Sequence, residues 1–225
     1  MSLRSALLAL ISGGPLTGYD AVKHFRSSVG HLWHAPDSQI YPELRKMQAE
    51  GLLSATEVPW GRKQATKTRY ELTDAGRAAL CEWQASPLGY APERDQPHLI
   101  AAYFEWGSHE TAAERLREHI AFYTEARAAA EQQAREIRER SSATLARRLQ
   151  VTRESEWDRI AAFKLFAYEG KITRANAEIA WAERGLELLA TLGPFDGPGT
   201  PVEPGAAGAR DAPGAPRGGG PVSAA

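Results

Sequence analysis

Residues 37–76 read DSQIYPELRKMQAEGLLSATEVPWGRKQATKTRYELTDAG. In the first part of this run, apolar residues recur at intervals of four and three, which predicts a helix with one buried face formed by Ile40, Leu44 and Met47. Gly51 is typical of a residue that ends such a helix. Two β-like runs follow, joined by a polar basic loop at 59–65. Near the end of the run, Thr73 can cap the start of a further helix.

The residues before this run predict two more short helices. Leu7 to Ile11 is apolar enough for a buried helix that ends at the Gly13-Gly14-Pro15 turn. Thr17 can cap a second helix with its own apolar stripe. Three short helices, a hairpin with a basic tip and a fourth helix follow one another in the order of a winged helix-turn-helix.

Several sequence elements of this segment match one family in the right order and in one register over residues 2–85. They are the apolar run Leu7 to Ile11, Leu16-Thr17-Gly18-Tyr19-Asp20, Gln39-Ile40-Tyr41-Pro42-Glu43-Leu44, Glu50-Gly51-Leu52-Leu53 and the run from Arg69 to Arg77. The segment thereby resembles the PadR-like transcriptional regulators. This resemblance implies a DNA-binding domain followed by a long helical domain that dimerises.

The helix at 37–50 is the candidate reader of DNA. If its apolar face is buried, the residues on or beside the outward face are Ser38, Gln39, Tyr41, Pro42, Arg45 and Lys46. Gln and Arg can contact base edges, whereas Ser, Tyr and Lys suit phosphates. An isolated helix with this face would be an ordinary solvated helix. Within a winged helix-turn-helix, we expect DNA contact.

The loop between the two strands is the second candidate contact. Arg62, Lys63 and Lys67 lie close together with no acidic residue between them, which suits the phosphate backbone or an adjacent minor groove. A bare charge run of this kind is more often a solvated loop. Arg69 belongs to the strand, where an acidic neighbour could pair with it.

The segment from 87 to 193 is predicted to be helical throughout. We expect a short apolar helix near Leu99, a long helix from about 109 to 137, a second from about 145 to 167, and a third from about 172 to 189. Apolar stripes of this kind seek partner helices within the chain or across a dimer. Spacing alone favours an intramolecular three-helix bundle equally. The resemblance favours dimerisation.

Six tryptophans occur in the chain, and several are expected to be core or interface anchors. The resemblance also implies that some family members bind phenolic acids or planar drug-like compounds near the domain junction or the dimer interface. The candidate ligand-binding residues for such an aromatic effector are Trp33, Phe122, Tyr123 and Trp157.

Composition excludes several other classes of protein. Lys and Arg number 27 against 28 Asp and Glu, so the chain is not a generally basic nucleic-acid coat. The single cysteine, Cys81, excludes an intrachain disulfide and is expected to be a small buried residue. His31, His34 and Asp37 have a spacing that could suggest a metal site, but the Ala35-Pro36 turn breaks it. No catalytic motif is present, so we expect no enzyme activity, metal or cofactor.

The sequence therefore predicts a mainly α-helical chain with a small β-hairpin wing. Residues 1–86 form the winged helix-turn-helix, 87–193 the helical dimerisation domain, and 194–225 a disordered tail with 8 Gly and 7 Pro. We expect a cytoplasmic, homodimeric, ligand-responsive repressor that binds a near-palindromic operator in double-stranded DNA. The alternative is a winged-helix module for protein contacts, without specific DNA binding.

Overall fold

The computed structural model describes residues 3–33, 35–61, 65–90, 92 and 94–197. Its elements are, in order, α1 (Leu3–Ile11), β1 (Leu16–Thr17), α2 (Gly18–Ser27), η1 (Val29–His31), α3 (Asp37–Ala49), β2 (Leu53–Trp60), β3 (Ala65–Leu72), α4 (Asp74–Ala85), α5 (Gln96–Ala101), η2 (Phe104–Trp106), α6 (His109–Arg138), α7 (Ala143–Gln150), η3 (Glu154–Glu156) and α8 (Trp157–Leu192). Within the described residues, no helix is both long and apolar enough to cross a bilayer.

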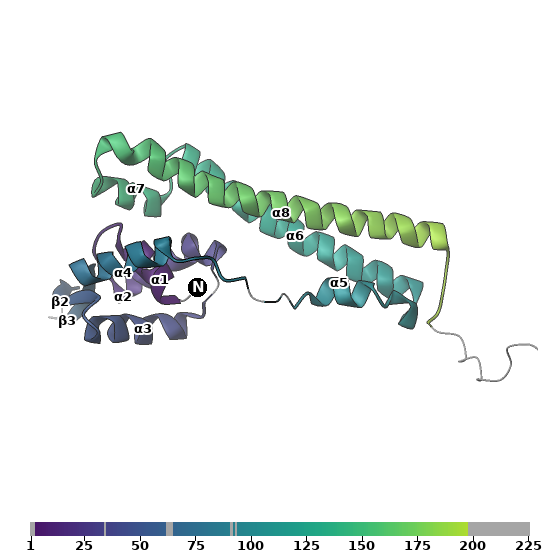
Figure 1. The fold of residues 1–225 in the computed structure, drawn as a ribbon, viewed down its shortest axis with the longest axis horizontal. Helices are drawn as coiled ribbons and strands as arrows, with labels where there is room; N and C mark the ends of the chain where they lie inside the picture. The colour runs from purple at the N-terminus through teal and green to yellow at the C-terminus, as the bar shows by residue number, and fades with distance from the viewer. Residues whose placement is uncertain (1–2, 34, 62–64, 91, 93, 198–225) are drawn as a thin grey trace, which may run out of the picture.

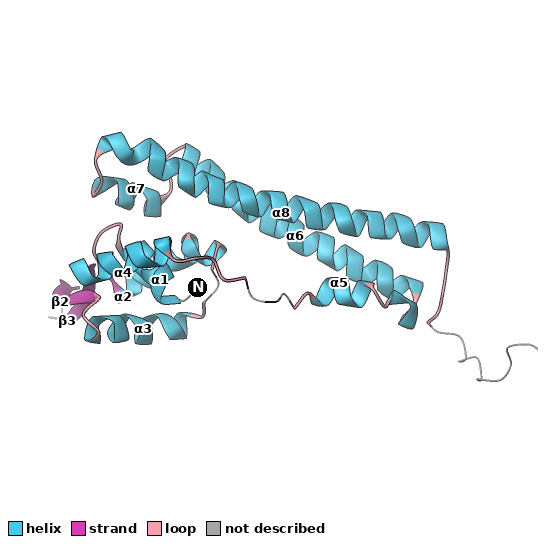
Figure 2. Cartoon of the chain, in the orientation of Figure 1, coloured by secondary structure: helices cyan, strands magenta, loops and turns pink. Residues whose placement is uncertain are grey.

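The elements from α1 to α4 surround one apolar core. Leu7 of α1, Phe25 of α2, and Ile40 and Leu44 of α3 are almost completely buried in it. The strands form an antiparallel sheet in the order β1-β3-β2, with β2 and β3 paired over their full length. Figure 2 shows this small sheet at one end of an otherwise helical molecule. The prediction of a mainly helical fold with a small wing is confirmed.

Threonine side chains form the N-caps of two of these helices. Thr17 accepts a hydrogen bond from the Asp20 amide at the start of α2, at 3.2 Å. Thr73 accepts one from the Gly76 amide at the start of α4, at 3.0 Å. Each bond satisfies a backbone donor that the first helical turn leaves without a partner. Capping therefore sets where both helices begin.

The helices α6 and α8 form a long antiparallel hairpin, with α7 at the corner nearest the N-terminal elements and α5 beside the opposite end (Figure 1). One apolar cluster lies at the α7 corner and includes Leu145 and Tyr168. Another lies at the opposite end, where Leu116 of α6 faces α8. A Cβ at Gly185 would lie 2.9 Å from Leu116 Cδ1, so the two helices cross closely there.

Two expectations from the sequence are wrong. The segment after α6 was expected to contain two long helices, but α7 is short and α8 runs without a break from Trp157 to Leu192 through Gly170. The Cys81 side chain is exposed and not buried. Helix α4 packs against the core along one edge only, and Cys81 lies off that edge.

The described part of 194–225 ends at Gly197. Within it, Phe195 packs against the cluster formed by α6 and α8. Its carbonyl accepts a hydrogen bond from the His109 amide at 2.7 Å. The residues just after α8 thus return to the start of α6, and the remainder, 198–225, lies outside the described residues.

Candidate nucleic-acid interface

Helix α3 lies on the side of the N-terminal elements that is turned away from the α6–α8 hairpin (Figure 1). Its buried face supplies Ile40, Leu44 and Met47, each with 0% of its surface exposed. All the residues that the sequence assigned to the outward face are exposed, namely Ser38, Gln39, Tyr41, Pro42, Arg45 and Lys46. The helix therefore offers them together on one open surface.

The acidic residues of α3 are held by arginines from other helices. Arg4 of α1 pairs with Glu43 at 2.8 Å and with Glu50, just after α3, at 2.5 Å. Hydrogen bonds to these two carboxylates raise the pKa of Arg4. At the start of α3, Asp37 pairs with Arg26 of α2. Each of these carboxylates is paired with an arginine, whereas Arg45 and Lys46 are the exposed charges on the outward face of α3.

The Tyr41 ring lies against the start of α2. A Cβ built on Gly18 would lie 2.7 Å from Tyr41 Cε1, so the absence of a side chain at Gly18 makes room for the ring. Although packed there, Tyr41 keeps 41% of its surface exposed. The hydroxyl end of Tyr41 is therefore available beside the N-terminus of α2.

The wing carries the second group of predicted DNA contacts. Lys67 lies on β3, opposite Val58 of β2. Its ammonium group is 4.1 Å from the ring centroid of Trp60 and 4.9 Å from that of Tyr19. Arg62 and Lys63 lie outside the described residues. The sequence did not reveal Tyr19 or Trp60 as interface residues, because their contact with Lys67 depends on the register of the strands and on the position of α2 beside β3.

A cavity of about 870 Å³ lies between the N-terminal elements and the α7 corner of the hairpin. Its apolar lining includes Trp33, Leu80 and Phe163. Its charged lining residues are Arg147, Arg148 and Lys164, and no carboxylate lines it among the described residues. Burial lowers the pKa of Lys164, and the nearby charges of Arg148 and Arg147 lower it further.

Residues of α7 connect this corner to the end of α1. Arg147 donates hydrogen bonds to the carbonyls of Gly14, at 2.6 Å, and Leu10, at 2.7 Å. Arg148 donates to the hydroxyl of Ser12 at 2.8 Å and also to its carbonyl. These carbonyls lie at a helix C-terminus, where a positive side chain is favourable.

Two further hydrogen bonds join the hairpin to α2. Thr144 Oγ1 lies 2.9 Å from Nδ1 of His24. The Tyr168 hydroxyl donates to the carbonyl of Ser28 at 3.0 Å. Burial raises the pKa of Tyr168 to about 12, so its hydroxyl remains a donor at neutral pH. The α7 corner is thus bonded directly to the helix that precedes α3.

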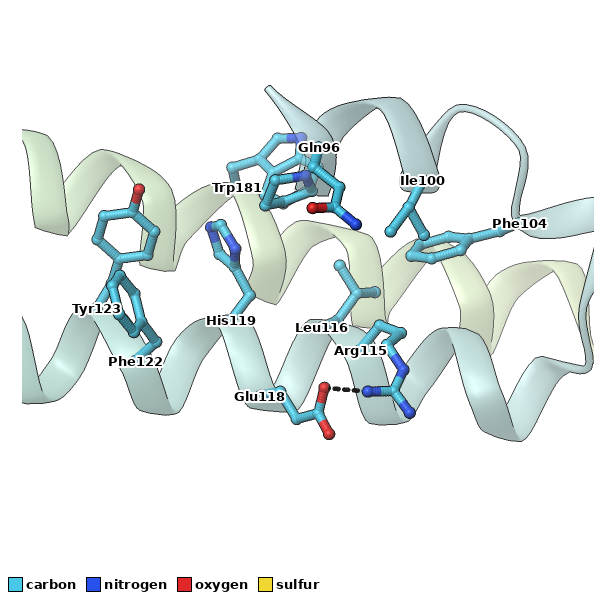
Figure 3. A pocket seen from close by; sticks show the side chains of 11 residues that line it. Gln96, Ile100, Phe104, Arg115, Leu116, Glu118, His119, Phe122, Tyr123 and Trp181 are labelled. Carbon is cyan, nitrogen blue, oxygen red and sulfur yellow. Dashed lines mark hydrogen bonds and ion pairs between the residues drawn. The ribbon is translucent and has the colours of Figure 1, made fainter. Parts of the chain in front are cut away.

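The four predicted ligand-binding residues do not surround one cavity. Trp33 lines the junction cavity. Phe122 and Tyr123 line a second cavity of about 380 Å³ at the other end of the hairpin, where α5, α6 and α8 meet (Figure 3). Trp157 lines neither of these cavities. Its indole donates to the carbonyls of Leu149 and Thr152, both at 3.1 Å, and closes the turn between α7 and α8.

The second cavity is lined by His119, and His98 of α5 lies close to it. His119 Nε2 lies 3.2 Å from a carboxylate oxygen of Glu178. His98 stacks on Trp181 with ring centroids 3.9 Å apart, and its Nδ1 lies 2.8 Å from Asp95. The stacking of His98 on Trp181 joins α5 to α8, and the His119–Glu178 pair joins α6 to α8. Among the described residues, no group of His, Cys, Asp and Glu side chains is arranged to hold a metal ion.

Comparison with known proteins identifies the N-terminal elements. Residues 7–82 match the model of the "Transcriptional regulator PadR-like family". The chain is 41% identical over 102 residues to the negative transcriptional regulator PadR of Bacillus subtilis, a match that covers 45% of this chain and 56% of that protein. It is 37% identical over 89 residues to "Probable transcriptional regulator Rv1176c" of Mycobacterium tuberculosis, covering 39% of this chain and 46% of that protein. The chain thus spans about half the length of the curated relatives that it matches.

Solved structures match over more of the chain. The crystal structure of B. subtilis PadR in complex with operator DNA superposes with a TM-score of 0.66 at 22% identity, over 83% of this chain and 98% of that one. The complex of the same protein with p-coumaric acid gives a TM-score of 0.61 at 23% identity, over 84% and 95%. At this identity the likeness establishes the fold. The likeness to the PadR-like transcriptional regulators in sequence is that of residues 7–82, which match the family model.

Proposed function

We propose that this chain is a sequence-specific DNA-binding repressor that acts as a homodimer and responds to a small effector. Residues 1–86 would bind DNA, 87–193 would dimerise, and the tail from 194 would be dispensable for both. The observation that carries the proposal is the outward face of α3. Its basic residues Arg45 and Lys46 are exposed, whereas the acidic residues of that helix are paired with Arg4 and Arg26.

The homodimer is supported by apolar surface on the helical half. Large side chains with more than half of their surface exposed occur along α5, α6 and α8 and in the turn between α5 and α6; they are Leu99, Tyr103, Trp106, Phe122, Phe163, Phe166, Leu188 and Leu192. So much exposed apolar surface on one arm is typical of an interaction site. Two copies related by a two-fold axis would place two α3 helices in successive major grooves, about 34–36 Å apart.

The junction cavity suits an aromatic carboxylate as the effector. Trp33 and Phe163 offer apolar faces, Lys164, Arg147 and Arg148 offer positive charge, and none of the described lining residues is a carboxylate. The complex of the B. subtilis relative with p-coumaric acid supports this class of ligand. An effector that binds the DNA-free geometry more tightly than the DNA-bound geometry releases the operator by shifting the population of dimers.

DNA binding is tested by titration with the fragment upstream of this protein's own gene, against scrambled DNA of equal length, over a salt series. We expect discrimination between the two and a steep decrease of affinity with salt. Arg45→Ala and Lys46→Ala should each reduce operator affinity by about 5- to 100-fold if they contact bases or phosphates.

Arg94→Ala is the control, since Arg94 is an exposed cation in the connection between α4 and α5. It should leave operator affinity unchanged. If a folded dimer binds neither DNA at low salt, the DNA-reading proposal is wrong and a winged-helix module for protein contacts takes its place. Binding without sequence preference would mean that this fragment does not contain the operator, and the titration is then repeated with neighbouring promoters.

The effector site is tested with p-coumaric acid as the probe. Lys164→Met removes one charge from the junction cavity, and we expect it to weaken binding by about 10-fold, since a hydrogen bond to a charged group contributes about 1.5–3 kcal/mol. Isothermal titration calorimetry measures this directly. Lys171→Met, at an exposed position farther along α8, should bind as the unchanged protein does. Equal affinities of all three proteins would contradict the assignment of Lys164.

A further inference from the structure

The start of α2 and the two strands of the wing bring together a cation and two aromatic rings. Lys67 Nζ lies over the ring of Trp60 at 4.1 Å and near the ring of Tyr19 at 4.9 Å. Both distances are within the range of a cation–π interaction. We call this group, Tyr19, Trp60 and Lys67, the wing stack.

The register of the sheet creates the wing stack. Val58 pairs with Lys67 and Trp60 pairs with Ala65, so Trp60 and Lys67 are diagonal neighbours across β2 and β3. Long and aromatic side chains reach each other over such a diagonal. On the other side of β3, β1 pairs Thr17 with Arg69. This pairing brings Tyr19, the second residue of α2, close to Lys67 on β3.

Both rings remain open to solvent although each is large enough to stabilise a core. Tyr19 has 60% of its surface exposed and Trp60 has 56%. Burial of an aromatic side chain stabilises a fold in proportion to the apolar area removed from water, and these two rings contribute only part of what they could. In the described structure, the ammonium group of Lys67 lies within cation–π distance of both rings.

Contact with the rings changes how Lys67 can meet a phosphate. A free lysine loses side-chain entropy when it is fixed in one conformation, and lysine is among the side chains that lose the most. In the wing stack, much of that ordering takes place before DNA arrives. The ammonium group has three donors, and a ring occupies only the side on which it lies. The remaining donors are free to bond a phosphate oxygen.

We infer that Tyr19 and Trp60 are positioning residues of the DNA interface, which hold Lys67 in a fixed geometry for one phosphate. The inference rests on the proposed function and adds two residues to the interface. It distinguishes them from base-reading residues, because a phosphate contact acts on any sequence. The wing stack therefore contributes to affinity on every duplex and leaves discrimination between sequences to α3.

The test is a double-mutant cycle for DNA binding with Trp60→Ala, Lys67→Gln and the combination of the two. It can be measured on duplex DNA of arbitrary sequence at low salt, because phosphate contacts do not require the operator. We expect Trp60→Ala to weaken binding by about 2- to 5-fold, which corresponds to an exposed cation–π interaction. In the Lys67→Gln background, the same substitution should have almost no effect.

Two further variants separate positioning from a role in folding. Trp60→Phe retains a ring and should recover much of the lost affinity. Tyr90→Ala removes a ring that is 88% exposed in the connection between α4 and α5, and it should leave binding unchanged. Thermal unfolding of each variant checks that the N-terminal elements remain folded.

The outcomes distinguish this inference from the proposed function. If the unchanged protein binds DNA and the two substitutions are additive, Trp60 does not act through Lys67 and the inference is wrong. The same holds if Trp60→Ala binds as tightly as the unchanged protein. If the unchanged protein binds no duplex at low salt, the proposed function itself is wrong and the wing stack has no phosphate to bind.

Discussion

The imidazole of His24 connects the stability of the junction to pH. Burial lowers its pKa below the ordinary value of 6.5, and the positive charge of Arg147 lowers it further, against a smaller opposite effect of Asp20. The folded state therefore favours the neutral ring, whose Nδ1 meets Thr144. This contribution is complete above the unfolded pKa of about 6.5 and is lost as the pH falls toward the lower folded pKa.

We expect the melting temperature to decrease between pH 7 and pH 5 and the decrease to be smaller in His24→Asn. An asparagine can bond Thr144 from a position close to that of Nδ1 and carries no titrating group. Calorimetry over this pH range, with both proteins in the same buffers, is the measurement. An identical pH dependence in the two proteins would show that His24 is not the group responsible.

Single residues also show what the sequence could and could not predict about the site. The spacing of Ile40, Leu44 and Met47 was sufficient to orient α3, because helical periodicity is a local property. It contained no information on Trp60 and Lys67, since their contact depends on the register between two strands. It also did not reveal that Arg147 bonds carbonyls more than 130 residues earlier in the chain.

Among the structural elements, α4 depends on a close contact at its first turn. A Cβ at Gly76 would lie 2.2 Å from the backbone oxygen of Leu52. Since backbone cannot move aside as a flexible side chain can, we expect Gly76→Ala to destabilise the protein by about 1–3 kcal/mol. Chemical denaturation of the two proteins measures the difference.

The same substitution in α8 should have the opposite sign. Gly170 is exposed inside a helix, and a Cβ there would meet nothing within 4 Å. In a helix interior, alanine is more favourable than glycine by about 1 kcal/mol, so Gly170→Ala should stabilise the protein. If both substitutions changed stability in the same direction, close packing at Gly76 would not be the reason.

The helices of the second half were harder to predict than those of the first. The apolar residues up to 167 and those from 172 predicted two separate helices, yet α8 continues through Gly170 between them. A long helix packed along a partner gains enough from tertiary contacts to tolerate one glycine. By contrast, the caps of α2 and α4 were predictable, because Thr17 and Thr73 bond the backbone of their own first turns.

For the whole molecule, the exposed apolar surface of the hairpin makes a prediction about assembly. Phe166 of α8 has 75% of its surface exposed. If the proposed homodimer buries it, Phe166→Asp places a charge in the interface and shifts the equilibrium toward monomers. Sedimentation velocity over a concentration series should show a dissociation constant raised by at least about 10-fold, since a buried unpaired charge costs several kcal/mol.

Leu88→Asp is the matched control, because Leu88 is 74% exposed but lies in the connection between α4 and α5. It should sediment as the unchanged protein does. A monomeric unchanged protein, or one whose assembly is insensitive to Phe166→Asp, would contradict dimerisation through this part of α8.

Because α8 is continuous, a small tilt at one of its ends produces a larger displacement at the other. Its 36 residues correspond to a rod about 54 Å long. The hydrogen bonds of Arg147 and Arg148 on α7 and of Tyr168 on α8 fasten the N-terminal elements near one end of this rod. A tilt of about 5° at the other end displaces the fastened end by about 5 Å, which exceeds one base-pair step of about 3.4 Å. If α3 binds the operator as proposed, a small tilt of α8 is therefore enough to move α3 out of register with its groove.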